Sequence, residues 1–202
     1  KYLLPAMFIT ASFFILWDVW FTEMGVWSFN AKYLLGINIL NLPLEEWMFF
    51  FTIPYACVFI YECLKCWFSI KMSLRSARFF SIPFASMLML ISALNYEKMY
   101  TGITFFLLAL LVLIQFILFK TEILRNFLPA YLIAIGPFFL VNGVLTSNPV
   151  VIYNDLENLA FRLWTVPFED IFYGMLLILM NITLMELFRQ RIFAKSFKPK
   201  PA

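Results

Sequence analysis

Six apolar runs at or near membrane-spanning length constrain the fold of this chain more than any other feature. They cover about residues 2–21, 43–64, 79–94, 101–119, 127–145 and 167–188. The hydrocarbon core of a bilayer is about 30 Å thick, and a helix needs about 20 apolar residues to cross it. With 63% hydrophobic and 13% charged residues, the chain is also far more apolar than a soluble domain. We expect one all-α integral membrane domain over residues 1–202, with about six transmembrane helices and a basic tail at 190–202.

The distribution of basic residues predicts which way the chain crosses the membrane. Cytoplasmic ends of membrane helices carry an excess of lysine and arginine. Six spans place both termini on one side, and only Lys32, Lys98 and Arg162 of the 15 basic residues fall on the other side. We therefore expect both termini in the cytoplasm of a bacterial cell, and no nucleic-acid partner. The sequence begins with Lys1 and not with methionine, which leaves room for a further N-terminal helix.

The residue types that the chain lacks limit the cofactors it can bind and the reactions it can catalyse. The chain has no histidine, so it lacks the commonest metal ligand and the usual general base at neutral pH. Its three cysteines, Cys57, Cys63 and Cys66, lie on or just after one apolar run and indicate no disulfide framework. The glycine-rich fingerprint of dinucleotide-binding folds is missing. We expect no flavin, nucleotide or metal cofactor, so that acid–base chemistry falls mainly to the 12 acidic residues.

An internal repeat relates the two ends of the chain. At an offset of 124 residues and without gaps, Pro43-Leu44-Glu45-Glu46 aligns with Pro167-Phe168-Glu169-Asp170, and Asp18 aligns with Asn142. We place repeat one at about residues 1–75 and repeat two at about residues 125–190. Four spans separate the matched helices, so both copies cross the membrane in the same direction. A pseudo-twofold axis along the membrane normal would then bring the two acidic pairs to the same depth, in the non-cytoplasmic half.

These two pairs of adjacent acids are the strongest candidates for catalysis. Glu45, Glu46, Glu169 and Asp170 lie at the starts of two apolar helices, where burying four carboxylates is costly unless something compensates. Helix capping is the alternative explanation, because an acid in the first turn of a helix interacts favourably with the helix dipole. A cap needs only one carboxylate, however, so capping does not explain why both copies carry a pair.

Only one acid of each pair can face the interior of the bundle, because neighbouring residues on a helix point about 100° apart. We rank Glu45 and Glu169 first and expect both to face one shared apolar cavity. Burial and a like-charged neighbour favour the neutral form of a carboxyl group. Such an acid can donate a proton to a weakly basic substrate while a carboxylate opposite takes a proton back.

Aromatic side chains crowd the same level of the predicted bundle. Aromatic rings attract cations, so they can surround a positively charged intermediate. The alternative is the belt of interfacial aromatic residues found in most membrane proteins. We expect Tyr173 and one of Trp47 and Trp164 to form cavity walls. The candidate substrate-binding residues are Trp20, Trp27, Trp47, Phe49, Trp164 and Tyr173.

A further matched pair of acids, Glu62 and Glu186, lies near the other ends of the same two helices. Each has a basic residue three positions later in the sequence, Lys65 and Arg189 respectively. Charges at this spacing are neighbours on a helix surface. We therefore expect ion pairs at the cytoplasmic edge of the membrane rather than a second site.

The motifs around the acids resemble those of a known family, the flavin-independent lycopene cyclases. The resemblance rests on Pro43-Leu44-Glu45-Glu46 with the following Trp47-Met48-Phe49-Phe50, and on the matching Pro167-Phe168-Glu169-Asp170. It also rests on Trp17-Asp18 with Trp20-Phe21-Thr22, which precede the first acidic pair. In this family the two halves occur either as two small subunits or as one fused chain, so the resemblance implies that both halves are fused here.

The resemblance also implies a reaction and the residues that perform it. An acid protonates the terminal double bond of a linear carotenoid such as lycopene, an internal double bond closes a ring on the cation, and a base removes a proton. Glu45, Glu46, Glu169 and Asp170 take the positions of the essential acids. Lycopene and the lipid bilayer are the implied partners, together with other carotenoid enzymes. Three alternatives remain: a hydratase that adds water to the same cation, a carboxylate-lined transporter, and a scaffold for other pigment enzymes.

Overall fold

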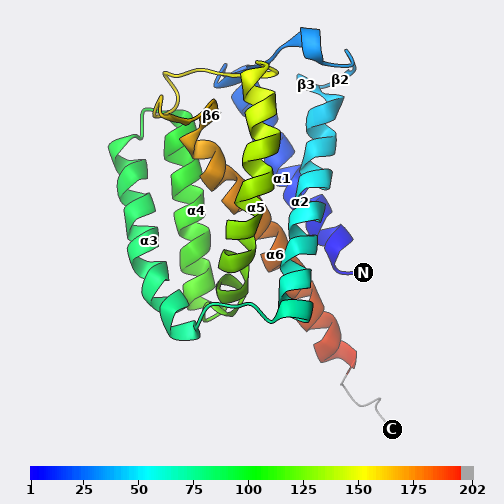
Figure 1. Ribbon diagram of the computed structural model, residues 1–202, viewed down its shortest axis with the longest axis vertical. Helices are drawn as coiled ribbons and strands as arrows, with labels where there is room; N and C mark the ends of the chain where they lie inside the picture. The colour runs from blue at the N-terminus through cyan, green and yellow to red at the C-terminus, as the bar shows by residue number, and fades with distance from the viewer. Residues whose placement is uncertain (197–202) are drawn as a thin grey trace.

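Six long helices form the body of the protein, as the apolar runs predict. The computed structural model describes the backbone of residues 1–196 and the side chains of residues 1–190, so the predicted basic tail lies almost wholly outside the described residues. All six helices are long and apolar enough to cross a membrane, and the chain is an integral membrane protein. The helices are α1 (Leu3–Glu23), α2 (Leu44–Cys63), α3 (Leu74–Leu94), α4 (Met99–Ile117), α5 (Glu122–Ser147) and α6 (Phe168–Ser196) (Figure 1).

Several helix boundaries differ from the expected ones, and α5, like α3, begins five residues earlier than expected. Both prolines that precede the acidic pairs lie one residue outside their helices, and Pro43 is the extended N-cap of α2. The third helix begins at Leu74, five residues earlier than expected, because the side chain of Ser73 accepts a hydrogen bond from the backbone of Ser76 at 3.0 Å and caps it. Arg75 and Arg78 interrupt the apolar run there, so hydropathy alone does not reveal the first turn.

Short strands, which the apolar runs do not predict, cover one end of the bundle. Strands β2 and β3 form a hairpin just before α2, and β5 and β6 form the matching hairpin before α6. Strands β1 and β4 pair with each other although they are far apart in the sequence (Figure 1). The strands are β1 (Trp27–Phe29), β2 (Asn38–Ile39), β3 (Leu42–Pro43), β4 (Val151–Tyr153), β5 (Arg162–Leu163) and β6 (Val166–Pro167).

The pairing of β1 with β4 follows a local twofold symmetry. The central residues of the two strands are 124 positions apart in the sequence, and they pair with each other. Two hydrogen bonds of 2.9 Å flank them, one from the Asn30 N–H to the Val150 carbonyl and one from the Asn154 N–H to the Val26 carbonyl. The offset of 124 residues relates Asn30 to Asn154 and Val26 to Val150, so the two hydrogen bonds are equivalent under the repeat. The contact between the repeats is therefore pseudosymmetric, while the repeat boundaries at about 1–75 and 125–190 stay a prediction.

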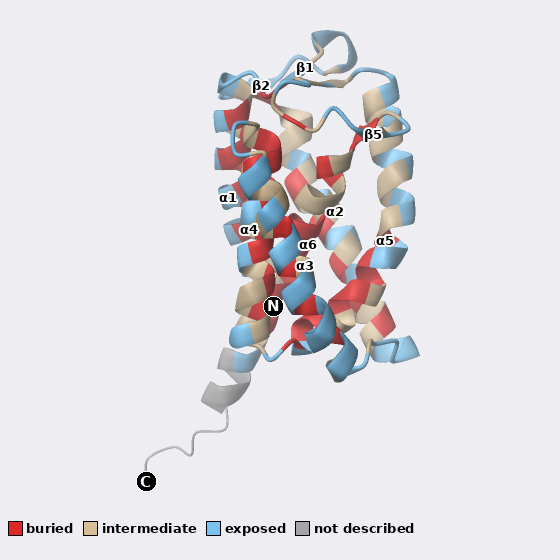
Figure 2. Ribbon diagram, turned by 90° about the vertical axis from the view of Figure 1, so that its left-hand side faces the viewer, coloured by how far each residue is buried: buried red, intermediate tan, exposed pale blue. Residues whose placement is uncertain are grey.

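Helix α6 lies at the centre of the bundle and packs against α1, α2, α4 and α5. Of its most apolar stretch, 61% is buried, against 22% for α3 and for α5. Helices α3 and α4 join the two repeats, with α4 packed against α6 and α3 packed outside α4. Buried residues gather on the inward faces, and the outward faces carry the exposed apolar side chains that a bilayer would cover (Figure 2). One edge of α6 stays open to a cavity.

Candidate active site

The first acid of each pair holds the loop that precedes its helix. An oxygen of Glu45 accepts a hydrogen bond from the backbone N–H of Leu35 at 2.7 Å. The equivalent oxygen of Glu169 accepts from the N–H of Leu159, also at 2.7 Å, and from the hydroxyl of Thr101 at 2.7 Å. These acids do not line the cavity. The expectation that Glu45 and Glu169 face it is therefore wrong, because the loop backbone takes up their carboxylates.

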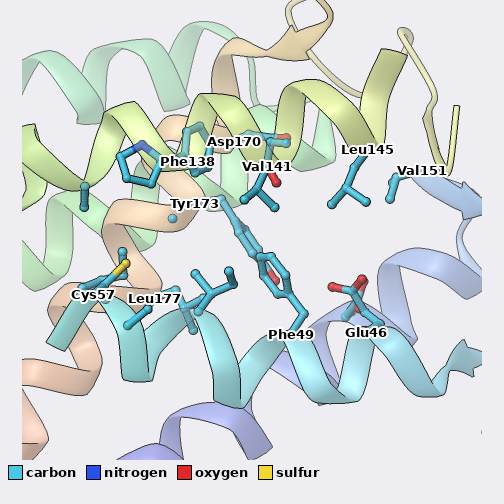
Figure 3. A pocket seen from close by; sticks show the side chains of 18 of the residues that line it. Glu46, Phe49, Cys57, Phe138, Val141, Leu145, Val151, Asp170, Tyr173 and Leu177 are labelled. Atoms are coloured by element: carbon cyan, nitrogen blue, oxygen red, sulfur yellow. The ribbon is translucent and has the colours of Figure 1, made fainter. Parts of the chain in front are cut away.

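The second acid of each pair, Glu46 on α2 and Asp170 on α6, points into one shared cavity (Figure 3). Both oxygens of Asp170 accept hydrogen bonds, one from the hydroxyl of Tyr100 at 2.6 Å and one from the hydroxyl of Tyr153 at 2.8 Å. Within the described residues, no hydrogen bond to a protein group reaches the side chain of Glu46. The two acids therefore occupy matched positions in unequal surroundings.

The cavity has a volume of about 240 Å³ and lies among α2, α5 and α6. Its walls are mostly apolar, and Glu46 and Asp170 lie toward the end that the strands cover (Figure 3). Gly174 contributes to one wall, where the absence of a side chain keeps the space open beside Phe138. Further lining residues include Ile53, Cys57, Tyr131, Ala134, Val141, Leu145 and Leu177.

A third acid, Asp18 on α1, also lines the cavity. It is only 2% exposed, and one of its oxygens accepts a hydrogen bond from the indole N–H of Trp27 at 2.6 Å. The other oxygen is buried and has no partner among the described residues. The repeat aligns Asp18 with Asn142, and no role is predicted for Asp18 from the sequence. The sequence does mark Asp18 as an acidic residue inside an apolar run, and acidic residues within membrane segments usually have a function.

Tyr153 lies outside the helices, in β4, and burial is the main influence on its hydroxyl group. Burial, together with the neighbouring charge of Asp170, raises the pKa of Tyr153 well above its usual range. The hydroxyl therefore stays protonated and remains a hydrogen-bond donor to Asp170. Neither Tyr153 nor Tyr100 is among the site residues predicted from the sequence. Tyr100 belongs to α4, outside the repeats, so the alignment of the repeats gives no signal for it.

The six aromatic candidates divide into two groups of three. Trp27, Phe49 and Tyr173 line the cavity beside the acids. The other three do not line it: Trp20 is 48% exposed, Trp164 is 87% exposed, and the indole N–H of Trp47 lies 3.3 Å from the carbonyl oxygen of Ile39. The expectation of a tryptophan wall from Trp47 or Trp164 is therefore wrong, whereas Tyr173 is placed as expected.

The acids at the other end of the helices form ion pairs, as predicted, but with partners from the opposite repeat. Lys65 pairs with Glu186 at 2.5 Å and Arg189 pairs with Glu62 at 2.9 Å. Arg189 also contacts Glu186 at 3.2 Å, and the hydroxyl of Tyr61 donates to Glu186. The offset of 124 residues converts the first pair into the second, so the local twofold symmetry extends through the membrane.

No group of three Cys, Asp or Glu side chains in the described part of the chain could hold a metal ion. The cavity instead places carboxyl groups and phenol hydroxyls beside an apolar space, with aromatic rings around them. Such a site can move protons onto and off an apolar molecule. The expectation that no cofactor is needed stays a prediction.

Comparison with known proteins identifies the family. A sequence model of the lycopene cyclase family matches residues 1–64 and 97–188 of this chain. The chain therefore belongs to the lycopene cyclase family, and the match includes both acidic pairs, Asp18 and Tyr153. The unmatched residues 65–96 include all of α3. No curated protein and no solved structure matches the chain. Membership implies an enzyme that cyclises a carotenoid.

Proposed function

We propose that this protein converts the linear end groups of lycopene, or of a related carotenoid, into β-ionone rings by acid catalysis in the membrane. The observation that carries the proposal is that Glu46 and Asp170, from matched helices, point into one apolar cavity. A carotenoid dissolves in the bilayer and offers only carbon–carbon double bonds to an enzyme. A site for it needs a proton donor, a proton acceptor and a dry space between them.

The surroundings of the two acids support different roles for them. Asp170 accepts two hydrogen bonds from tyrosine hydroxyls, and hydrogen bonds of this kind stabilise the ionised form of a carboxyl group. Glu46 faces apolar side chains and receives no hydrogen bond within the described residues, which favours its neutral form. We assign Glu46 as the proton donor and Asp170 as the base. Glu45 and Glu169 act as positioning residues that hold the helix starts.

The proposed reaction changes neither the composition nor the oxidation state of the substrate. The carboxyl proton of Glu46 adds to the terminal double bond and leaves a tertiary carbocation. The electron pair of an internal double bond forms the carbon–carbon bond that closes a six-membered ring, and the positive charge moves into that ring. Asp170 removes a proton from the adjacent ring carbon, whose C–H electrons become the ring double bond. The proton then returns from Asp170 to Glu46.

Aromatic rings at the cavity support the carbocation step. Trp27, Phe49 and Tyr173 line the space between the acids, and an aromatic ring that faces a cation in a dry site stabilises it by about 2 kcal/mol. The apolar walls also keep water from the cation. Water would add to it and give a hydroxylated product, so the lining favours cyclisation over hydration.

The test of this proposal is expression of the chain in cells that accumulate lycopene, followed by chromatography of the extracted pigments. We expect pigments with one or two β-ionone rings in these cells and unchanged lycopene in cells that carry an empty vector. A hydroxylated carotenoid would indicate the hydratase instead. Unchanged lycopene, with the protein present and folded in the membrane, would contradict the proposal. The transporter and the scaffold would then be the remaining functions.

The proposal includes an orientation, with both termini in the cytoplasm and the acids in the outer half of the membrane. Cys66, which is exposed near the end of α2, provides a measurement. In a Cys57→Ser/Cys63→Ser background, we expect a membrane-impermeant maleimide to label Cys66 in inside-out vesicles and not in intact cells or spheroplasts. A cysteine introduced at Lys32, in the opposite loop, is the matched control and should show the reverse pattern.

A further inference from the structure

We propose that Asp18 is a positioning residue that keeps Glu46 protonated and so sets the direction of proton transfer across the cavity. The inference rests on the proposed function and extends it to a residue for which that function gives no role. Its basis is a comparison of the surroundings of two acids that the repeat makes equivalent. The local twofold symmetry holds from the strands to the ion pairs, so Glu46 and Asp170 occupy equivalent positions.

The location of Asp18 lets it act on Glu46. Both side chains line the cavity, on the neighbouring helices α1 and α2. Asp170, on α6, lines the same cavity, so three acids share this space. The short hydrogen bond from the indole N–H of Trp27 stabilises a negative charge on Asp18. Its second oxygen has no hydrogen-bond partner among the described residues, so the indole of Trp27 is the group that favours the ionised form.

Three mismatches between the repeats all distinguish Glu46 from Asp170 in the same direction. Repeat two, which carries Asp170, has a hydroxyl donor, Tyr153, and a cation, Arg162. Repeat one has neither group at the equivalent positions. Repeat one has an acid where repeat two has a neutral amide. Arg162 pairs with Asp155 and lies 5.8 Å from the ring centre of Tyr153, whose hydroxyl donates to Asp170. The mismatched pairs are Phe29 with Tyr153, Asn38 with Arg162, and Asp18 with Asn142.

These differences make the protonation of the two acids unequal in a site that the repeat alone would make symmetric. A like charge in a low-dielectric site favours the neutral form of a carboxyl group, and a hydrogen-bond donor or a cation favours the ionised form. Asp18 therefore favours a neutral Glu46, and Tyr100, Tyr153 and Arg162 favour an ionised Asp170. A symmetric pair would divide its protons between two equivalent states, and only one of them could start the reaction.

The test uses Asp18→Asn, which removes the charge but keeps an oxygen that accepts from Trp27. We expect kcat for cyclisation of lycopene in detergent micelles to fall at least about 10-fold with KM unchanged, because Glu46 loses part of its proton occupancy. Asp18→Glu should retain more activity than Asp18→Asn. If Asp18 only held Trp27 in place, the asparagine variant would keep the wild-type kcat, and such a result would overturn the inference.

A second variant tests the same polarity if Asp18→Asn fails to fold. Phe29→Tyr adds one hydroxyl at a cavity-lining position, and the repeat relation directs it toward Glu46 as Tyr153 is directed toward Asp170. We expect a loss of kcat of at least about 10-fold here as well. Wild-type kcat in this variant would overturn the inference. A wild-type protein that forms no ring overturns the proposed function too, whereas active wild type with unaffected variants overturns only the role of Asp18.

Discussion

Glu46→Gln and Asp170→Asn should each reduce ring formation at least about 100-fold while the protein remains folded in the membrane. General acid–base catalysis contributes about 100- to 10,000-fold to a rate, and an amide neither donates a proton to an alkene nor removes one from a carbocation. Both amides keep the size of the acid they replace, so the cavity keeps its shape. The measurement is the initial rate of ring formation per amount of monodisperse protein.

The matched controls are Glu45→Gln and Glu169→Gln, one residue earlier in the same helices. A glutamine oxygen can still accept the hydrogen bonds from Leu35 and Leu159 that hold the loops. We therefore expect losses below about 10-fold, smaller than those of the cavity-facing variants. Equal losses in all four variants would contradict the division of roles within each pair. Wild-type rates for Glu46→Gln would contradict the catalytic assignment itself.

The helices could be predicted from the sequence because a bilayer imposes a simple rule on composition. A spanning segment must be helical and apolar over about 20 residues, whatever its neighbours are. The repeat also predicted that the matched helices run in the same direction and that their acids lie at one level, because it aligns residues that the structure brings together. The strands followed no such rule. They are two or three residues long, and their hairpins place Leu40 and Trp164 at positive φ, a conformation for which neither residue type gives a signal.

The choice between adjacent acids could not be made from the sequence, because it depends on where the preceding loop runs. A helical wheel separates Glu45 from Glu46 by about 100° but does not say which of them faces the interior. The choice follows from backbone groups at Leu35 and Leu159, which need an acceptor and find one in the first acid. Sequence patterns record which acids are present, and the loop determines their roles.

The cross-repeat ion pairs lead to the second large effect, which concerns stability. Glu186→Gln should lower the free energy of unfolding by about 1 to 3 kcal/mol, less than the full value for a buried pair because Lys65 is partly exposed. The variant leaves Lys65 without its anion and weakens the contact with Arg189. Glu186 lies about 24 Å along α6 from Asp170. The folded fraction should therefore keep wild-type cyclisation kinetics.

A double-mutant cycle with Lys65→Met separates this pair from general damage to α6. Because Lys65 and Glu186 bridge the two repeats, the double variant should be less destabilised than the sum of the two single variants. Glu122→Gln is the control, since Glu122 pairs with Arg125 on the surface of a single helix and should change stability by less than about 0.5 kcal/mol. Denaturant titration in detergent micelles, followed by tryptophan fluorescence, gives all four values. Additive losses in the cycle, or a loss for Glu186→Gln no larger than that of the control, would show that the pair does not hold the repeats together.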